Sequence, residues 1–530
     1  MRKLMLVLGL AALATSGSVT ATAQAQGPAA SEVEVSAAGH HDVSPPLRDL
    51  RSGPRGLEQK RERPLLPSGP SYQGGADPVL QTVAGALIAS TPGVNIAGVG
   101  NGDYGFVPNA APPDTNGAVG ATQYVQWVNE SFAVFDKTTG AIAAGFPKTG
   151  NTLWTGFGGN CEIRNDGDPI AQYDKAANRW VLTQFSVPSG GPYEQCVAVS
   201  TTSDATGTYN RYSFNYGNVQ FIDYPKLGVW PDAYYVTYNI FNNGTTFAGA
   251  KLCAWDRTAM VAGLPATQQC FQLSSSFGGV LPSDLDGTTA PPAGSPNFML
   301  NFGASSLNEW KFHVDFANSA NTTLTGPISI PVGAFTSACG GGACIPQPST
   351  SNRLDSLADR LMYRLAYRNR AGTESLVANH TVKVSGTKKT EVDGVRWYEL
   401  HNPNGAGGAN VFQSGTYSPD SNSRWMGSIA MDKVGNIAVG YSVSSGTTNP
   451  SIRYTGRVPS DPPGTLQAEN SIQSGGGSQT GNLHRWGDYS AMTVDPVDDC
   501  TFWYTNEYLK NSGSFNWSTK IASFKLPGCL

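Results

Sequence analysis

The feature that most constrains the fold of this chain is a unit of two short strands that recurs along the sequence. In its clearest copy, residues 485–508, a polar segment precedes a mostly apolar strand, a turn rich in Asp and Pro, and an aromatic strand. Six further segments follow the same plan, and successive starts lie roughly 55 to 72 residues apart. The seven units are residues 112–129, 167–185, 223–241, 295–316, 353–382, 424–443 and 485–508.

A repeat of this length, with two strong strands and room for two more, is typical of a β-propeller blade. One small twisted sheet cannot bury both of its faces, but sheets stacked around a common axis bury them against one another. The many Gly and Pro residues between aromatic and β-branched runs also favour an all-β protein. We therefore predict an all-β fold with a single β-propeller, of seven blades, at residues 98–530. A series of β-sandwich domains is the alternative, but no linker interrupts this range.

The first 97 residues differ in composition from the rest. Residues 1–25 read as a signal peptide, because two basic residues precede an apolar run and small residues suited to cleavage. Residues 26–97 are predicted to be a disordered leader or pro-segment, since 26–73 are rich in Pro, Arg and Glu and almost free of aromatics. Residues 77–90 have helical spacing and are predicted to form one short helix. His40, His41 and Asp42 resemble a metal cluster, but a disordered spacer explains them better.

The eight cysteines indicate disulfide bonds. Their number is even, and no C-x-x-C or zinc-type spacing with His occurs. We predict four sequence-local bonds and an exported, soluble protein, periplasmic or extracellular, because disulfides persist in oxidising compartments. The predicted pairs are Cys161–Cys196, Cys253–Cys270, Cys339–Cys344 and Cys500–Cys529.

Charge and hydropathy exclude two classes of partner. Charged residues make up 14% of the chain and the formal net charge is −4, which argues against nucleic-acid binding. No segment after the signal peptide is long and apolar enough to span a membrane. An extracellular glycan or polysaccharide is the expected partner, and we expect a monomer.

The polar segments that precede the inner strands are the expected functional positions, because they converge at one end of a propeller's central channel. Aspartates in these segments could act as general acids and bases, and the adjacent tyrosines as nucleophiles or as lyase bases. The candidate catalytic residues are Asp114, Asp168, Asp223, Tyr224, Asp488 and Tyr489.

Arginines recur in three successive units and are candidates for substrate binding. Arginine presents a planar fork that binds carboxylates in bidentate fashion, so converging arginines would select an acidic sugar, a sulfate or a phosphate. The alternative is that each arginine pairs with an aspartate as a structural clasp. Two tryptophans could stack on sugars, although a core position is the stronger interpretation, and one histidine precedes the last unit. The candidates are Arg353, Arg360, Arg424, Arg485, Trp425, Trp486 and His484.

Four oxygen-rich loops could hold a structural Ca²⁺, but no cofactor is certain. None matches the EF-hand loop, and Asx turns explain them equally well. The loops contain Asp114 and Asn116, Asp166 and Asp168, Asp284 and Asp286, and Asp495, Asp498 and Asp499.

Residues 418–425, SPDSNSRW, are similar to the Asp-box of sialidases, Ser-x-Asp-x-Gly-x-Thr-Trp, and depart from it at Asn422 and Arg424. The box marks a blade turn and is not catalytic. Sialidase-type propellers also share an arginine triad, an Asp acid/base and a Tyr/Glu nucleophile pair, which the arginines and aspartates above resemble. Residues 112–530 further resemble a group of exported bacterial proteins with PPDTNGAVG-, DYPKLGVWPD- and RWGDYS-like segments, with which we associate no established activity. These resemblances imply a propeller.

Two functions are compatible with these features. We expect an exported carbohydrate-active enzyme, a glycoside hydrolase or polysaccharide lyase, acting on an acidic glycan at the central pocket. The alternative is a non-catalytic propeller that serves as a surface adhesin or as a glycan- or protein-binding module. A hydrolase of esters or peptides ranks last, because no Gly-x-Ser-x-Gly elbow occurs.

Overall fold

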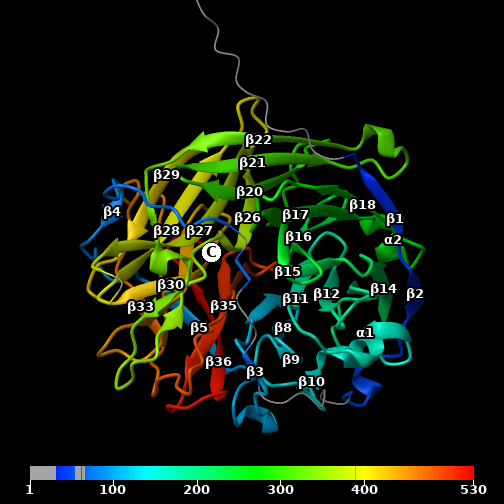
Figure 1. Cartoon of the computed structure of the whole chain (residues 1–530), viewed down its shortest axis with the longest axis horizontal. Helices are drawn as coiled ribbons and strands as arrows, with labels where there is room; N and C mark the ends of the chain where they lie inside the picture. Colours follow the sequence, from blue (N-terminus) through cyan, green and yellow to red (C-terminus); the bar gives the residue numbers. More distant parts are fainter. Residues whose placement is uncertain (1–31, 54–60, 63–65, 68, 388) are drawn as a thin grey trace, which may run out of the picture.

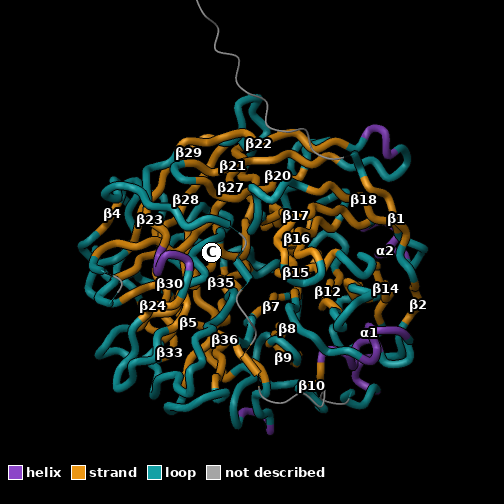
Figure 2. The backbone as a smooth tube through the Cα atoms, in the orientation of Figure 1, coloured by secondary structure: helices purple, strands orange, loops and turns teal. Residues whose placement is uncertain are grey.

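The molecule consists almost entirely of β-sheets placed around a central axis (Figure 1), with few and short helices (Figure 2). The structure, a computed structural model, describes residues 32–53, 61–62, 66–67, 69–387 and 389–530. Counted over these residues, seven four-stranded antiparallel meanders make up the body of the molecule. The expected signal peptide lies outside the described residues.

In six meanders the four strands follow one another along the chain. The first contains β7 (Asn116–Val119), β8 (Gln123–Val128), β9 (Ser131–Asp136) and β10 (Lys148–Thr149). The second contains β11 (Ile170–Asp174), β12 (Arg179–Ser186), β13 (Glu194–Ser200) and β14 (Tyr209–Asn215). The third contains β15 (Gln220–Val229), β16 (Tyr234–Asn242), β17 (Thr246–Trp255) and β18 (Thr267–Gln272). The fourth contains β19 (Leu281–Asp286), β20 (Asn297–Gly303), β21 (Ser306–His313) and β22 (Thr323–Pro331).

The remaining meanders complete the circle. The fifth contains β26 (Met362–Arg370), β27 (Thr373–Ser385), β28 (Val392–His401) and β29 (Asn410–Tyr417). The sixth contains β30 (Ser423–Met431), β31 (Ile437–Ser444), β32 (Ser451–Arg457) and β33 (Asn470–Gln473). The last contains β34 (Ala491–Val494), β35 (Thr501–Leu509), β36 (Trp517–Lys525) and a strand from the N-terminal region, β5 (Thr91–Ala97).

The first strand of each meander is its innermost strand, and these strands form a closed ring. Neighbours contact one another in the order β7, β11, β15, β19, β26, β30 and β34, and β34 contacts β7. The strands β19 and β26 also pair directly, in parallel. The ring closes through β5, which pairs antiparallel with β36, so that the two ends of the chain share one sheet. The predicted all-β propeller is confirmed.

The core lies between neighbouring sheets. One apolar cluster joins Trp127 of the first sheet, Trp180 of the second and Trp517 of the last, all of which are buried. Each sheet thus buries its faces against the sheets beside it, as radial stacking requires.

The fourth repeat begins one strand earlier than predicted. Residues 295–316 form β20 and β21, whereas the innermost strand of this sheet is β19. The hairpin is richer in aromatics than the LPSDLD sequence of β19, so it matched the expected pattern better than the inner strand did.

The described part of the predicted disordered leader is ordered along the outer edges of the sheets. Strand β1 (Glu34–Ala37) pairs with β18, and β2 (His40–Val43) pairs with β14, each as a fifth strand. The helix expected at residues 77–90 is wrong, because this stretch is irregular apart from β4 (Leu80–Gln81), which pairs with β29. Free sheet edges supplied hydrogen bonds that sequence periodicity does not reveal.

The other elements are short. The α-helices are α1 (Gly159–Ile163) and α2 (Arg257–Ala262). The 3₁₀ turns are η1 (Leu47–Asp49), η2 (Asp103–Gly105), η3 (Gly150–Trp154), η4 (Ser319–Asn321) and η5 (Ala338–Gly341). The remaining strands are β3 (Arg61–Glu62), β6 (Ala110–Ala111), β23 (Thr336–Ser337), β24 (Ala343–Ile345) and β25 (Leu354–Asp355). Among the described residues, none of the helices has the length and apolar character needed to cross a membrane.

All four predicted disulfides are present, between Cys161 and Cys196, Cys253 and Cys270, Cys339 and Cys344, and Cys500 and Cys529. The bond between Cys253 and Cys270 joins facing residues of β17 and β18. The bond between Cys500 and Cys529 joins the start of β35 to the segment after β36 and so staples the last sheet.

Candidate functional site

Three of the predicted aspartates occupy equivalent positions just before the innermost strands. Asp114, Asp168 and Asp488 precede β7, β11 and β34, and each has a left-handed backbone, with φ of 46°, 47° and 58°. Aspartate tolerates this conformation better than most residues. Tyr224, with φ of 54°, has the corresponding place in β15, beside the bulge between Asp223 and Lys226. One backbone feature, repeated from sheet to sheet, therefore brings these side chains to the same end of the channel, here called the lip end.

The centre of the cluster is a buried lysine that sequence reasoning missed. Lys226 has no solvent-exposed surface, and its Nζ lies 3.4 Å from the ring centre of Tyr224 and 3.9 Å from that of Tyr489. It donates a hydrogen bond to the Pro225 carbonyl at 2.8 Å. Burial lowers the pKa of Lys226 to about 7, although the negative charges of Asp168, Asp488 and Asp114 oppose this shift.

Two of the carboxyls around Lys226, those of Asp114 and Asp223, have raised pKa values. Burial, reinforced by the charges of Asp488 and Asp168, raises the pKa of Asp114 well above its usual range. Asp114 Oδ1 has no hydrogen-bond partner among the described residues. Burial and the charge of Asp168 raise the pKa of Asp223 to about 7, against the opposing effect of Arg360. These two aspartates are therefore the candidates for a protonated carboxyl at neutral pH.

Two of the predicted arginines reach the cluster, and both form ion pairs there. Arg485 pairs with Asp488 and lies 3.2 Å from Asp355. Arg360 forms a bidentate pair with Asp359, at 2.7 and 3.0 Å. The Arg360 guanidinium also lies 4.3 Å from the ring centre of Tyr224. Its Nη2 donates to the Leu66 carbonyl at 3.1 Å, so the N-terminal region reaches the lip end.

The two tyrosines tie neighbouring strands together across the cluster. Tyr489 Oη donates to the Pro169 carbonyl at 3.0 Å, and Tyr224 Oη donates to the Asp488 carbonyl at 3.4 Å. The Tyr224 main-chain N–H donates to Asp168 Oδ2 at 3.2 Å. Burial raises the pKa of both tyrosines, so neither phenol loses its proton readily.

A polar network closes the channel below the cluster. Arg364 pairs with Asp284 at 2.6 Å and with Asp286 at 2.7 Å, and its Nη1 donates to the Met492 carbonyl. Gln172 Nε2 donates to Asp284 Oδ2 at 2.8 Å. All of these side chains are buried. The lip end is therefore a site at one end of the molecule and does not continue as an open pore through this network.

Arg424 does not join the other arginines. It is fully buried and pairs with Asp420 at 2.8 Å and with Glu469 at 2.9 Å. Tyr441 donates to the same glutamate, and Arg453 pairs with it as well. The predicted convergence of three arginines is thus wrong for Arg424, because the carboxylates of Asp420 and Glu469 hold its guanidinium between strands.

The two predicted sugar platforms are also core residues. Trp425 and Trp486 have no solvent-exposed surface and pack on each other with ring centres 6.0 Å apart. Trp486 Nε1 donates to Ser442 Oγ at 3.0 Å. His484 is exposed, and its Nδ1 lies 2.8 Å from the main-chain carbonyl oxygen of Arg353. Arg353 therefore contacts His484 through its backbone and not through its guanidinium.

Three of the four predicted calcium loops contain carboxylates that already have cationic partners. Asp166 pairs with Arg164, Asp286 with Arg364 and Asp499 with Arg368, each at 2.7 Å. Calcium binding stays a prediction for these loops.

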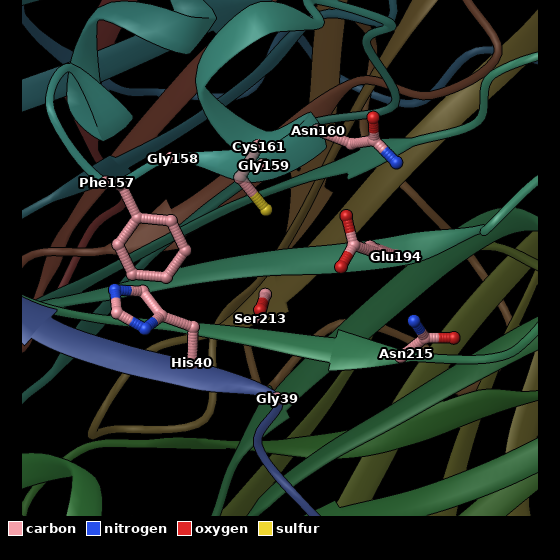
Figure 3. Close-up of a pocket in the computed structure, with 10 residues that line it drawn as sticks. All are labelled: Gly39, His40, Phe157, Gly158, Gly159, Asn160, Cys161, Glu194, Ser213 and Asn215. Carbon is pink, nitrogen blue, oxygen red and sulfur yellow. The ribbon is translucent and has the colours of Figure 1, made fainter.

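A hollow of 400 Å³ lies at the outer edge of the second sheet (Figure 3). Strand β2 forms one wall, where the His40 ring packs edge-on against Phe157 with ring centres 4.5 Å apart. Glu194 lies on another wall, and burial raises its pKa. None of the candidate catalytic or substrate-binding residues lines this hollow, and the docked N-terminal segment supplies Gly39 and His40 to its wall.

Sequence signals existed for part of what was missed. Lys226 is the one charged residue within the apolar stretch PKLGVW, and Arg364 similarly interrupts MYRLAY. A charge inside an inner strand is uncommon enough to indicate a buried partner. The partners themselves could not be identified, because they come from other sheets.

Comparisons with known proteins identify similar folds only. No protein-family model and no curated protein matches the sequence. A PL25 ulvan lyase, a polysaccharide lyase, is 11% identical with a TM-score of 0.35, over 80% of this chain and 97% of that one. A thermostable family-43 glycoside hydrolase is 12% identical with a TM-score of 0.29, over 68% and 92%. The WD40 domain of SCAP from fission yeast is 10% identical with a TM-score of 0.31, over 76% and 82%. Because these proteins differ in activity, the function must be argued from the site.

Proposed function

We propose that this chain is a carbohydrate-active enzyme that cleaves a glycan at the lip end of the central channel. The observation that carries the proposal is the convergence of Asp114, Asp168, Asp223 and Asp488, from four sheets, around the buried Lys226. Cleavage of a glycosidic bond by acid–base catalysis needs one protonated and one ionised carboxyl. A cluster in which like charges and burial keep some carboxyls protonated can supply both forms.

In this proposal Asp223 is the general acid and Asp488 the carboxylate. Asp223 has a pKa near 7 and is only half-buried, so it can deliver a proton to a leaving group at neutral pH. Asp488 is also half-buried and forms an ion pair with Arg485, which orients it. The raised pKa values of Tyr224 and Tyr489 favour hydrolysis over β-elimination by a tyrosine base.

The class of substrate is inferred from the basic side chains beside the carboxyls. Arg360 and Arg485 are the basic forks beside the carboxyls, and an acidic sugar would use them. Both are already paired with aspartates, so we propose a glycan substrate and test acidic and neutral glycans together. We further propose that the protein is exported, since its four disulfides suit an oxidising compartment and its first residues read as a signal peptide.

The test is cleavage of a panel of acidic and neutral polysaccharides, followed through new reducing ends and through unsaturated products. Asp223→Asn and Asp488→Asn should each lower the rate by about 100-fold or more, because they remove the acid or the carboxylate. Asp136→Asn is the matched control, since Asp136 is an exposed carboxyl at the end of β9. Cleavage that persists in both site variants would contradict the proposal.

A non-catalytic glycan-binding propeller is the second candidate. The ion pairs of Arg485 with Asp488 and of Arg360 with Asp359 are the clasps expected of such a module. It predicts binding of a panel glycan without any product, and binding that Asp223→Asn leaves unchanged.

A further inference from the structure

A second candidate site lies at the opposite end of the channel, where the innermost strands finish. A cavity of 210 Å³ is lined by residues at the ends of β11, β15 and β19. A cavity of 340 Å³ beside it is lined by residues at the ends of β19 and β26 and in the turns after β30 and β34. The two share Gly287 and Thr288, and together they fall within the about 300–1,000 Å³ typical of ligand sites.

The first cavity presents a mostly apolar wall. Trp230, Pro231 and Leu285 line it, and Pro231 is exposed. Its two basic side chains are neutralised: Arg257 pairs with Asp174 at 2.6 Å, and Lys175 pairs with Asp286 at 3.2 Å. This half can therefore contact the apolar face of a ring without offering a free charge.

The second cavity is basic. Arg368, Arg370 and Lys433 line it together with the single carboxylate of Asp499. Arg368 binds both oxygens of that carboxylate in a bidentate pair, at 2.8 and 2.7 Å. In the described part of the chain, Arg370 and Lys433 therefore form no ion pair with an aspartate or glutamate side chain.

The contacts of these two cations are weak or made to the main chain. Arg370 Nη1 lies 3.4 Å from the Val434 carbonyl, and its Nε is buried without any hydrogen-bond partner among the described residues. Lys433 is exposed, and its Nζ donates to the Asp498 carbonyl at 3.1 Å and to an oxygen of Leu530, the last residue of the sequence, at 2.8 Å. The terminal carboxylate at Leu530 partly neutralises Lys433, so Arg370 is the main free cation of this cavity. A side chain at Gly435 would collide with the Arg370 guanidinium, so this glycine leaves room for it.

One competing anion that interacts with Arg370 is already occupied. Glu399 interacts electrostatically with Arg370, but its carboxylate accepts hydrogen bonds from Gln413 at 2.5 Å and contacts His401 at 2.7 Å. Arg370 consequently retains donors for a ligand.

We propose that these joined cavities bind a sugar that carries an oxyanion, either a carboxylate or a sulfate. The ring lies against Pro231 and Leu285, and Arg370 and Lys433 hold the oxyanion. Arginine suits this task because its fork matches both groups in bidentate fashion. The site is independent of the proposed cleavage, because the network around Arg364 separates it from the carboxyls at the lip end.

The test is calorimetric titration of the full-length protein with three oligosaccharides: one containing glucuronic acid, one sulfated, and one neutral of the same length. At least one acidic oligosaccharide should bind, and raising the salt concentration should weaken it. Arg370→Gln and Lys433→Gln should each weaken binding about 10-fold. Asp223→Asn and the exposed control Lys389→Gln should leave it unchanged.

A further variant distinguishes loss of the site from unfolding of the protein. Thr288→Glu places a negative charge at an exposed residue shared by both cavities and should abolish binding without removing any packing. Acidic binding that this variant leaves unchanged, or neutral binding that it weakens equally, overturns the proposal. Loss of binding in Asp223→Asn would show that the ligand binds at the lip end, and this result would also overturn the proposal.

Discussion

At the scale of single residues, the lip end is a cluster of ionisable side chains whose charged forms are destabilised by burial. Lys226 is fully enclosed between two tyrosine rings, while four aspartates surround it. Burial disfavours the charged form of an acid and of a base alike, which moves the pKa of Asp223 up and that of Lys226 down, both to about 7. Near neutral pH the cluster can therefore exchange protons with a bound ligand at little cost.

The raised pKa of Asp223 predicts how stability depends on pH. Its folded-state pKa of about 7 exceeds the usual 3.8, so the folded state binds the extra proton between these values. The stabilisation is complete below pH 3.8 and is lost as pH rises through 7. Asp223→Asn removes this loss, and its free energy of unfolding relative to the unchanged protein should rise by up to about 4 kcal/mol from pH 4 to pH 8.

Denaturant titrations at the two pH values measure this difference. Lys226 has a pKa of about 7 and is present in both proteins, so its own titration largely cancels from the comparison. In Asp136→Asn the relative stability should stay constant from pH 4 to 8, because the pKa of Asp136 is lowered and lies below that range. Parallel pH profiles for Asp223→Asn and the unchanged protein would show that Asp223 is not protonated in the fold.

At the scale of strands, the sequence was informative where a pattern is local. Inner strands such as β7, β11 and β34 were found because a polar segment, an apolar strand and an aromatic strand follow in order. The four disulfides were found because each closes a short stretch of chain. The aspartates and tyrosines of the lip end were found because they share one position in the repeat.

What could not be predicted depends on partners distant in sequence. Arg424 opens an Arg-Trp pair as Arg485 does, but Asp420 and Glu469 hold it between strands, and the local sequence does not identify Glu469 as a partner. Burial of Trp425 and Trp486 follows from the neighbouring sheets. Strands β1 and β2 have little apolar character, and only the free edges of β18 and β14 make them strands. Local patterns thus identify elements, whereas orientation and edge pairing require the assembled ring.

The disulfide bond in the last sheet allows a prediction about the stability of that sheet. The bond between Cys500 and Cys529 closes 29 residues, and that between Cys339 and Cys344 closes 5. In the chain-entropy model the longer loop contributes about 3.5 kcal/mol and the shorter about 2 kcal/mol. Replacing both cysteines of the longer bond by serine should lower the unfolding midpoint more than the same replacement in the shorter bond. Calorimetry without reductant measures both, and the reverse order would show that the last sheet is held by β5 alone.

At the scale of the whole molecule, the N-terminal region acts as a strap around the ring. Strands β1, β2, β4 and β5 extend the third, second, fifth and last sheets in turn. A segment that contacts so many sheets resists the opening of the ring, because the sheets would have to release it first. The described part of this region is therefore a structural component of the propeller.

Two buried cations make this role testable. Arg211 and Lys251 are almost fully buried, and their carboxylate partners, Asp42 and Glu34, both lie on the strap. A chain that begins at residue 54 would leave both cations without these partners and would expose the edges of β14 and β18. Since removing one partner of a buried pair costs about 3–5 kcal/mol and these carboxylates are partly exposed, we expect a loss of several kcal/mol in total.

The comparison is between chains that begin at residue 32 and at residue 54, by thermal unfolding and by light scattering. The shorter chain should unfold at a lower temperature and aggregate, because unpaired edges recruit other strands. In the longer chain, Glu34→Gln with Asp42→Asn removes the charges but keeps the strands, so it should lower stability without causing aggregation. Equal unfolding temperatures for the two chains would mean that the ring is closed by β5 and that β1 and β2 only lie on it.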